Sequence, residues 1–240
     1  GSGKTTTLYA VLSRIIKKKI NVVTVEDPVE KVLEGMTQVQ VNPKSGLTFA
    51  TALRSILRQD PDVIMVGEMR DKETVSIGVR AAITGHLVFS TLHTNDCAST
   101  INRLRNMGVA PYMVAAALSG IVAQRLVKVL CPMCCREYEP DERERGLLEG
   151  LGAGKVDKLW KASGCPCCNG TGYSRRKAVY ELMEVDEEVK FMITDNVLPK
   201  EIRTYQKKRG FRSLKENVVQ MAIHGETSME EAEKILYSAE

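Results

Sequence analysis

The chain opens with a run that is typical of the second half of a phosphate-binding loop, Gly1-Ser2-Gly3-Lys4-Thr5-Thr6. Glycines let backbone N–H groups approach phosphate oxygens, because no Cβ stands in the way. Lys4 offers a positive charge to the β- and γ-phosphates of ATP, and Thr5 offers a hydroxyl to Mg²⁺. The helix that starts here adds the positive end of its dipole. The predicted nucleotide-binding residues are Gly1, Ser2, Gly3, Lys4, Thr5 and Thr6.

This loop is incomplete at its start. The first glycine of the pattern G-x-x-x-x-G-K-[ST] is absent from the sequence, and so is the strand that should precede it. A working nucleotide fold needs that buried strand, so we expect the chain to be the C-terminal part of something longer. Two alternatives stay open. Gly1-Ser2 is an expression remnant, or Gly1 is a true start exposed by removal of methionine.

An acidic residue follows the apolar run Asp62 to Gly67, which predicts a buried strand. In open α/β sheets, ligands bind at the carboxyl ends of the strands, and Glu68 lies at this end. We therefore expect Glu68 to be the carboxylate on the Mg²⁺ side of the site, a Walker B element. The alternative is an ordinary acid at a strand end that caps the next helix.

Three more carboxylates follow the strand predicted at 21–25, in the run Glu26-Asp27-Pro28-Val29-Glu30. Pro28 cannot continue a helix and fixes a turn, so we expect all three on one short rigid loop at the same sheet edge. Such a cluster repels itself unless a cation is near, and Mg²⁺ would supply that charge. The alternative is a solvated acidic turn.

Two histidines bracket a third predicted strand, Leu87 to Thr91. His86 precedes this strand and His93 follows it, so we expect only one of them to face a γ-phosphate. We favour His93, because it lies at the carboxyl end of the strand. For His86, a purely structural role is given equal weight.

Four of the seven cysteines fall into two C-x₂-C pairs, Cys131 with Cys134 and Cys165 with Cys168. The pairs lie about thirty residues apart, and two such turns direct four thiolates at one tetrahedral centre. They predict a zinc site that is structural, because a closed Cys₄ site leaves no open position for catalysis. A redox pair is the less favoured alternative.

The candidate site residues must be positioned by regular secondary structure. Strand and helix patterns alternate along the chain up to about Lys128. Alternation of this kind predicts an α/β fold with a mostly parallel sheet and helices on both faces. The predicted strands are the three named above. The helices are expected to start at Lys4, after the caps Thr48 and Asp71, at Asp96, and at Pro111.

The residue composition and pattern change twice farther along the chain. From Cys131, cysteine, proline, glycine and charged residues dominate. After Tyr180, short amphipathic helices are predicted, the last with a Ser228-x-x-Glu231 capping box. The expected parts are an α/β core at 1–128, a zinc lobe at 129–178 and a helical region at 179–240.

The composition restricts the classes of protein to which the chain can belong. With 240 residues, 43% of them hydrophobic, the chain can bury a sizeable core. The net charge of +4 is mild, and no basic run with interleaved aromatics predicts a nucleic-acid surface. The longest apolar stretch, Val109 to Ala123, is too short to cross a bilayer. Paired cysteines beside an ATP site fit a reducing cytosol.

Four motifs stand in order along the chain: GSGKTTTLYA, VEDPVE, LRQDPDVIMVGEMRD and TGHLVFSTLHTND. They resemble the Walker A, Asp-box, Walker B and His-box motifs of the secretion ATPase superfamily behind type II secretion and type IV pili. The resemblance implies a RecA-like P-loop ATPase core working in a hexameric ring. It implies that Glu30 is the general base and that Glu68 supports Mg²⁺ and its water. Arginines from neighbouring subunits complete such sites, and Arg54, Arg58 and Arg70 lie near the motifs.

The resemblance continues through the cysteine region and covers essentially the whole chain. The family pattern Cys-x-x-Cys-x-x-Thr-Gly-Tyr is matched through Tyr173. The implied zinc ligands are Cys131, Cys134, Cys165 and Cys168. Cys135 and Cys167 lie beside them and could replace them. Arg175 stands where the family usually has glycine, and Cys97 where a small residue is usual.

The implied function is an ATP-hydrolysing motor for type IV pilus assembly or type II secretion, since retraction relatives usually lack the zinc lobe. The implied partners are five further copies, an inner-membrane platform protein and other secretion or pilus components. The motor would lie in the cytoplasm at the inner face of the membrane, held there through partners only, with no direct nucleic-acid contact. The alternatives are a DNA-uptake motor and a non-catalytic zinc-dependent docking module. The predicted catalytic residues are Glu30, Glu68 and His93, with Mg²⁺ at Thr5 and Glu68.

Overall fold

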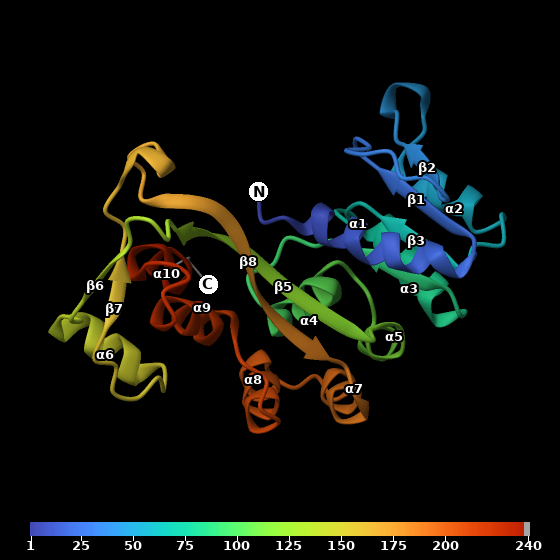
Figure 1. Cartoon of the computed structure of the whole chain (residues 1–240). Helices are drawn as coiled ribbons and strands as arrows, with labels where there is room; N and C mark the ends of the chain where they lie inside the picture. The colour runs from blue at the N-terminus through green and yellow to red at the C-terminus, as the bar shows by residue number, and fades with distance from the viewer. Residues whose placement is uncertain (238–240) are drawn as a thin grey trace. The chain divides into compact units, whose positions relative to one another are not determined.

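The computed structural model describes residues 1–237 of the chain (Figure 1). These residues separate into two compact units. Unit 1 comprises Gly1–Gly3, Val122–Met183 and Thr204–Glu240, and unit 2 comprises Lys4–Ile121 and Glu184–Arg203. Residues 238–240, which end the helical region expected at 179–240, lie outside the described residues.

Unit 2 is built on a four-stranded parallel sheet with the strand order β2-β1-β3-β4. The strands are β1 Val22–Glu26, β2 Thr37–Gln40, β3 Val63–Val66 and β4 Leu87–Ser90. β1 and β3 are buried along their whole length, as central strands of a covered parallel sheet must be. The predicted parallel sheet is confirmed. β2 was not predicted, because its polar, partly exposed Thr-Gln-Val-Gln sequence carries little strand signal.

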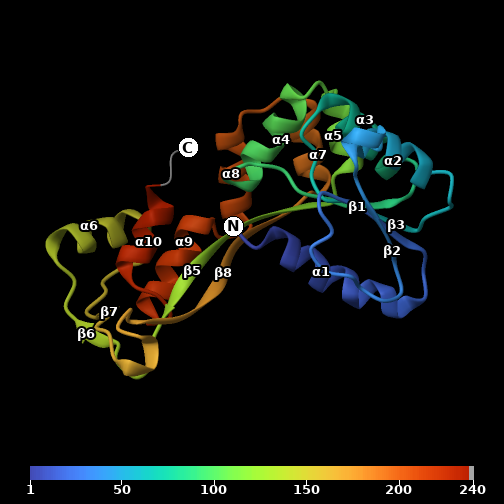
Figure 2. The same cartoon turned by 90° about the horizontal axis from the view of Figure 1, so that it is seen from above.

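Helices cover both faces of this sheet, as the alternation of patterns predicts. α1 lies on one face, and α2 and α3 lie on the other (Figure 2). The helices are α1 Lys4–Ile15, α2 Phe49–Ile56, α3 Lys72–Ile83, α4 Cys97–Asn106, α5 Pro111–Ala117 and α7 Glu187–Thr194, and α8 Pro199–Lys208 begins here. Short 3₁₀ turns occur at Ile16–Lys18 (η1) and Pro43–Ser45 (η2). The predicted starts at Thr48, Asp71, Asp96 and Pro111 are confirmed.

Asp96 caps α4 and also joins it to α8. Its carboxylate accepts the N–H of Ser99 at 2.7 Å and pairs with the guanidinium of Arg203 at 2.6 Å. Burial alone raises the pKa of the Asp96 carboxyl, but the bonds from Ser99 and the charge of Arg203 outweigh it, and the pKa lies below its ordinary value. The ionised carboxylate therefore stabilises the folded unit.

Asp96→Ala is expected to lower the free energy of unfolding by about 1–2 kcal/mol at neutral pH, because it removes a cap and an ion pair. Since the folded-state pKa is lowered, the stabilisation is present above the unfolded-state value of about 4 and is lost as pH falls through the folded-state value. Urea titrations at decreasing pH should show the mutant and wild-type curves converging below about pH 4. A difference that persists unchanged in acid would contradict this role.

The first helix is anchored by a hydrophobic core between α1 and the sheet. The core consists of Tyr9, Leu12, Val22, Val63 and Met65. Strand side chains alternate between the two faces, so Thr24 and Glu26 point to the same side as Val22. The face of the sheet that α1 covers therefore carries an acidic side chain at the carboxyl end of β1.

Unit 1 contains two small sheets and the cysteine region. β5 Gly120–Leu130 and β8 Tyr173–Glu184 form one two-stranded sheet, and β6 Arg136–Tyr138 pairs antiparallel with β7 Leu159–Lys161. The helices are α6 Glu142–Gly150, α9 Leu214–Ile223 and α10 Met229–Leu236, with a 3₁₀ turn η3 at Pro166–Cys168. α9 and α10 pack on each other and on β7. None of the helices among residues 1–237 is long and apolar enough to span a membrane.

At the start of α10, Ser228 caps the helix as predicted, but Glu231 has a different partner from the one predicted. The Ser228 hydroxyl accepts the N–H of Glu231, as a cap does. The Glu231 carboxylate, however, accepts the backbone N–H of Lys128 at 3.2 Å and pairs with Lys234. Because Lys128 belongs to β5, Glu231 fastens the last described helix to the long two-stranded sheet.

Candidate functional site

The first turn of α1 carries predicted phosphate-binding residues. α1 begins at Lys4, and its first turn contains no acidic residue that would offset the positive end of the helix dipole. Backbone N–H groups in a first helical turn have no acceptor within the helix and can bind an anion. These features fit the phosphates of a nucleotide. Lys4, Thr5 and Thr6 begin unit 2, whereas Gly1, Ser2 and Gly3 belong to unit 1.

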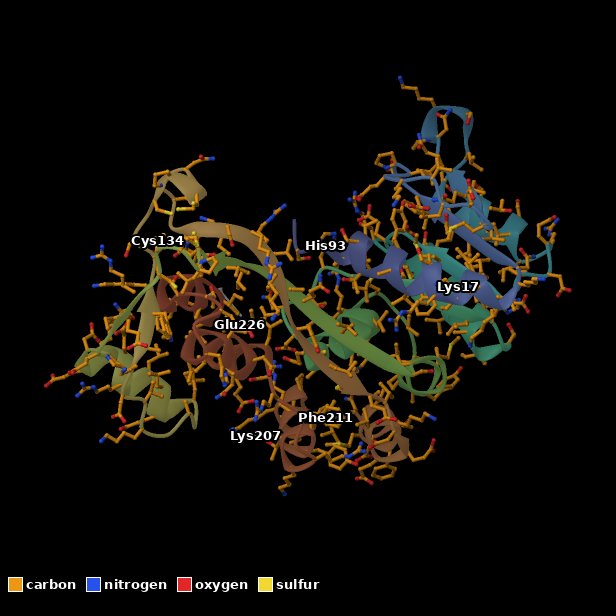
Figure 3. The ribbon with its side chains drawn as sticks, viewed as in Figure 1. Lys17, His93, Cys134, Lys207, Phe211 and Glu226 are labelled. Carbon is orange, nitrogen blue, oxygen red and sulfur yellow. The ribbon has the colours of Figure 1, made fainter. Side chains whose placement is uncertain are left out.

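The carboxyl ends of three neighbouring parallel strands carry the predicted catalytic residues. Glu68 follows β3, His93 follows β4, and the run that ends in Glu30 follows β1. The Oε2 atom of Glu68 lies 3.5 Å from Nε2 of His93 (labelled in Figure 3) and 2.6 Å from Nε of Arg70. The Glu68 side chain is 15% exposed. The structure thus brings Glu68 and His93 together, and Arg70 is the cationic partner of the carboxylate.

A glycine lets the ends of β1 and β3 approach each other just before Glu68. The N–H of Gly67 donates to the carbonyl of Val25 at 2.8 Å. A Cβ at this position would lie 3.3 Å from that same carbonyl oxygen, tighter than ordinary contact. On the other side, the Thr91 hydroxyl donates to the carbonyl of Gly67 at 2.7 Å. These bonds fix Glu68 between the segments that follow β1 and β4.

Glu26 does not join the acidic cluster that the sequence predicts. The residue is buried, with 2% of it exposed, and its side chain contacts Tyr9 of α1. It accepts hydrogen bonds from the hydroxyls of Tyr9 and Thr24 and from the side-chain amide of Gln38. The expectation that all three carboxylates of this run lie on one loop is therefore wrong for Glu26, because it belongs to β1 and its oxygens accept hydrogen bonds within the protein.

The segment that carries Glu30 is held through its backbone. The N–H of Glu30 donates to the Tyr9 hydroxyl at 3.2 Å, and the N–H of Val29 donates to the side-chain oxygen of Gln40 at 3.1 Å. The Glu30 residue itself is exposed. A fixed backbone therefore presents an accessible carboxylate beside the sheet edge where Glu68 lies.

The sequence leaves the roles of His86, Cys135 and Cys167 undecided, and the structure shows the surroundings of each. The Nδ1 atom of His86 lies 3.1 Å from the carbonyl oxygen of Ala81, at the amino end of β4, which supports the structural alternative for this histidine. Cys135 is half-buried, and Cys167 is exposed. Within residues 1–237, neither cysteine belongs to the cluster described next.

The predicted zinc ligands form one cluster in unit 1, where Figure 3 labels Cys134. The four sulfurs lie within 4.8 Å of one another, and three of the pairs are separated by 3.7, 3.8 and 3.9 Å. A tetrahedral site with Zn–S bonds of about 2.3 Å places its sulfurs about 3.8 Å apart. The donor set therefore fits zinc. The cluster consists of Cys131, Cys134, Cys165 and Cys168.

Backbone N–H groups point at one sulfur of the cluster. Cys168 Sγ accepts from the N–H of Cys165 at 3.2 Å and from that of Gly172 at 3.1 Å. Burial raises the pKa of the Cys168 thiol, but these bonds outweigh it and lower the pKa to about 6. Gly172 has a φ of +75°, and a Cβ there would lie 2.5 Å from the Cβ of Ala162, so this position requires glycine.

The family model described as Type II/IV secretion system protein matches residues 1–234. This chain belongs to that family. Type IV pilus assembly ATPase PilB of Thermus thermophilus is 47% identical over 234 residues, which are 96% of this chain and 26% of that protein. Type II secretion system protein HxcR of Pseudomonas aeruginosa is 44% identical over 239 residues, covering 100% of this chain and 47% of that protein. The chain thus spans half or less of these relatives.

Solved structures of a pilus retraction motor and of an ATPase resemble the chain as well. The pilus retraction motor PilT with bound ADP gives a TM-score of 0.73 at 29% identity, over 98% of this chain and 58% of that one. The ATPase DotB of Legionella pneumophila gives 0.67 at 25% identity, over 100% of this chain and 58% of that one. These likenesses confirm the RecA-like α/β fold that the motifs imply.

In this member of the secretion family, two residues that contact the site were not predicted from the sequence. Tyr9 contacts both Glu26 and the Glu30 backbone, and Gln38 contacts Glu26. The signal for Tyr9 is its place on the buried face of a helix, because a buried tyrosine hydroxyl needs a hydrogen-bond partner. Gln38 lies on β2, whose polar sequence hides both the strand and the contact.

Proposed function

We propose that this chain hydrolyses ATP as part of a motor subunit for type IV pilus assembly or type II protein secretion. The observation that carries the proposal is the 3.5 Å approach of Glu68 and His93 at the carboxyl edge of a parallel sheet. Glu30 and the first turn of α1 belong to the same unit. Ligands bind at such edges in open α/β sheets. PilB and HxcR, which belong to pilus assembly and secretion, support this proposal.

We assign the roles by chemistry. Lys4 sets its ammonium against the β- and γ-phosphates, while Thr5 and Glu68 hold Mg²⁺, which supplies positive charge to the phosphate oxygens. His93 contacts the γ-phosphate beside Glu68. Glu30 accepts a proton from the attacking water. The remaining phosphate contacts come from Gly1, Ser2, Gly3 and Thr6.

We further propose that the cysteine cluster holds a structural zinc ion. The sulfur separations of 3.7–3.9 Å match those of a closed tetrahedral site. Four protein ligands leave no position for water, so the metal would stabilise its lobe without catalysis. We propose a functional division into an ATPase core at 1–128, a zinc lobe at 129–178 and a helical region at 179–240, whereas the compact units group 184–203 with 4–121 and 204–237 with 122–183.

The working assembly is proposed to be a homo-hexamer. It would act on an inner-membrane platform protein and other secretion or pilus components from the cytoplasmic face of the membrane. The support comes from the relatives, which are parts of secretion and pilus systems. Force on the platform, rather than a released product, would be the output of each ATPase cycle.

Glu30→Gln tests the proposed base. The amide keeps the size of the carboxylate but cannot accept a proton, so kcat for ATP hydrolysis should fall by about 10²- to 10⁴-fold. The KM for ATP should change by less than about threefold, because the role lies in the chemical step. Steady-state phosphate release by the full-length protein that contains this chain measures both.

A matched control is Glu34→Gln, which changes another exposed acid of the same segment and should leave kcat near the wild-type value. If Glu30→Gln keeps wild-type turnover, another residue activates the water. If the full-length wild-type protein shows no turnover at concentrations that permit ring assembly, the ATPase function itself is wrong.

A further inference from the structure

Glu26 is a buried acid whose carboxyl oxygens accept hydrogen bonds from neutral groups. It ends β1 at 2% exposure, where an ionised carboxylate is costly unless hydrogen bonds satisfy it. The donors are the hydroxyls of Tyr9 and Thr24 and the Nε2 of Gln38, the last at 3.1 Å. These contacts come from α1, β1 and β2. Glu26 is thus a point at which three elements of unit 2 meet.

The Tyr9 hydroxyl makes two bonds of opposite direction. A phenol has one proton to give and lone pairs to accept with. The proton goes to Glu26, and a lone pair accepts the backbone N–H of Glu30 at 3.2 Å. Burial first, and then the hydrogen bond to Glu26, raise the pKa of Tyr9, so the hydroxyl keeps the proton that it donates. One hydroxyl therefore connects the buried acid to the backbone of the exposed one.

The tyrosine is itself fixed. Tyr9 is 8% exposed and packs in the core with Leu12, Val22, Val63 and Met65. It lies on α1, the helix whose first turn contains Lys4 and Thr5. The position of its hydroxyl is consequently tied to the position of the phosphate-binding turn.

Gln38 secures the far side of the same segment. Its Nε2 atom bonds Glu26 and also the carbonyl of Lys31 at 3.0 Å, while its Oε1 atom accepts the N–H of Leu33 at 2.7 Å. The backbone between residues 29 and 33 is therefore held by side chains from α1 and β2. Such contacts determine where the carboxylate of Glu30 can reach.

We propose that Tyr9, supported by Glu26 and Gln38, is a positioning residue that sets Glu30 relative to the first turn of α1. The inference rests on the proposed function, in which Glu30 accepts a proton from water. Tyr9 touches neither the nucleotide nor the water in this scheme. It acts only through Glu30, and that makes it separable from a residue that merely stabilises the fold.

A double-mutant cycle in the full-length protein tests this inference. Tyr9→Phe should lower kcat by about ten- to a hundredfold, because small displacements of a catalytic group are costly, with KM for ATP changed less than about threefold. In a Glu30→Gln background, the same substitution should lower kcat no further, since the group it positions is already inactive. Binding of ADP with Mg²⁺ should be unaffected in all four proteins.

Tyr138→Phe is the matched control. Tyr138 also donates its hydroxyl to a carboxylate, that of Glu144, but in unit 1. It should lower thermal stability in the same way as Tyr9→Phe and leave kcat unchanged. If Tyr9→Phe does not fold, Gln38→Met runs the same cycle with the same expected result.

The outcomes distinguish the positioning role of Tyr9 from the catalytic role of Glu30. Equal losses of kcat from Tyr9→Phe in the wild-type and Glu30→Gln backgrounds, or no loss in the wild type, overturn the positioning role alone. An equal loss from Tyr138→Phe overturns it too, by showing a general effect of stability. Full turnover in Glu30→Gln overturns the assignment of the base and this inference with it.

Discussion

Glu68→Gln is expected to abolish ATP turnover in the full-length protein and to leave unit 2 folded. The Glu68 carboxylate is 15% exposed and lies at the end of β3, with Nε2 of His93 at 3.5 Å and Nε of Arg70 at 2.6 Å. Glutamine retains the shape and the hydrogen-bonding oxygen but loses the charge that we propose holds Mg²⁺. A loss of about 10³-fold or more is expected, since most phosphoryl-transfer catalysis comes from positioned charge.

Two controls sharpen this prediction. Glu73→Gln removes an exposed acid of α3 that pairs with Arg54, and it should not change turnover. Lys4→Ala should abolish turnover as Glu68→Gln does, whereas Lys17→Ala, at the opposite end of the same helical segment (Figure 3), should not. Circular dichroism checks the fold of each variant. Retained hydrolysis in Glu68→Gln or Lys4→Ala would refute the site assignment.

Removal of the metal is expected to unfold the cysteine lobe of unit 1. Binding of structural zinc is worth about 10–16 kcal/mol in small modules, and this lobe has little else to replace it. Its strands β6 and β7 have three residues each, and its fully buried side chains include only Leu148 and Leu159 between the two cysteine pairs. Hydrogen exchange should rise steeply between Cys131 and Gly172 after chelation and stay unchanged in β1 and β3.

The metal content provides the direct check. One zinc ion per chain is expected by elemental analysis of protein purified without added chelator. Cys168→Ser should lose the zinc and the protection from exchange. Cys167→Ser changes the adjacent, exposed cysteine and should keep both. Full zinc occupancy in Cys168→Ser, or protection that survives complete metal removal, would show that the cluster does not support the lobe.

The elements around the site were largely predictable because their signals are local. β1, β3 and β4 are short apolar runs at the expected places, Thr48 and Asp71 cap the helices that they were expected to cap, and a helix begins at Asp96 as expected. A strand buried on both faces needs continuous apolar residues, and a helix start needs a side-chain acceptor. Both requirements can be read within a few residues.

What could not be predicted depends on contacts between distant segments. Whether Glu26 joins an acidic cluster or turns inward is decided by Tyr9, on another element, and by the face of β1 on which it falls. The carboxylate of Glu231 was expected to bond its own cap, but a backbone N–H of β5 takes it. β2, β5 and β8 were missed because partly exposed strands lack a continuous apolar signal.

The cysteine cluster also determines where the chain can gain or lose residues. It joins positions 34 residues apart, and the segment between the pairs therefore forms a closed loop. The entropy of closing such a loop grows only with the logarithm of its length, so doubling it costs about 0.6 kcal/mol. The turn between α6 and β7 contains Gly152 and Gly154, where an added Cβ would meet no other atom within 4 Å. Insertions and deletions should accumulate in this turn, while the spacing within each cysteine pair stays constant.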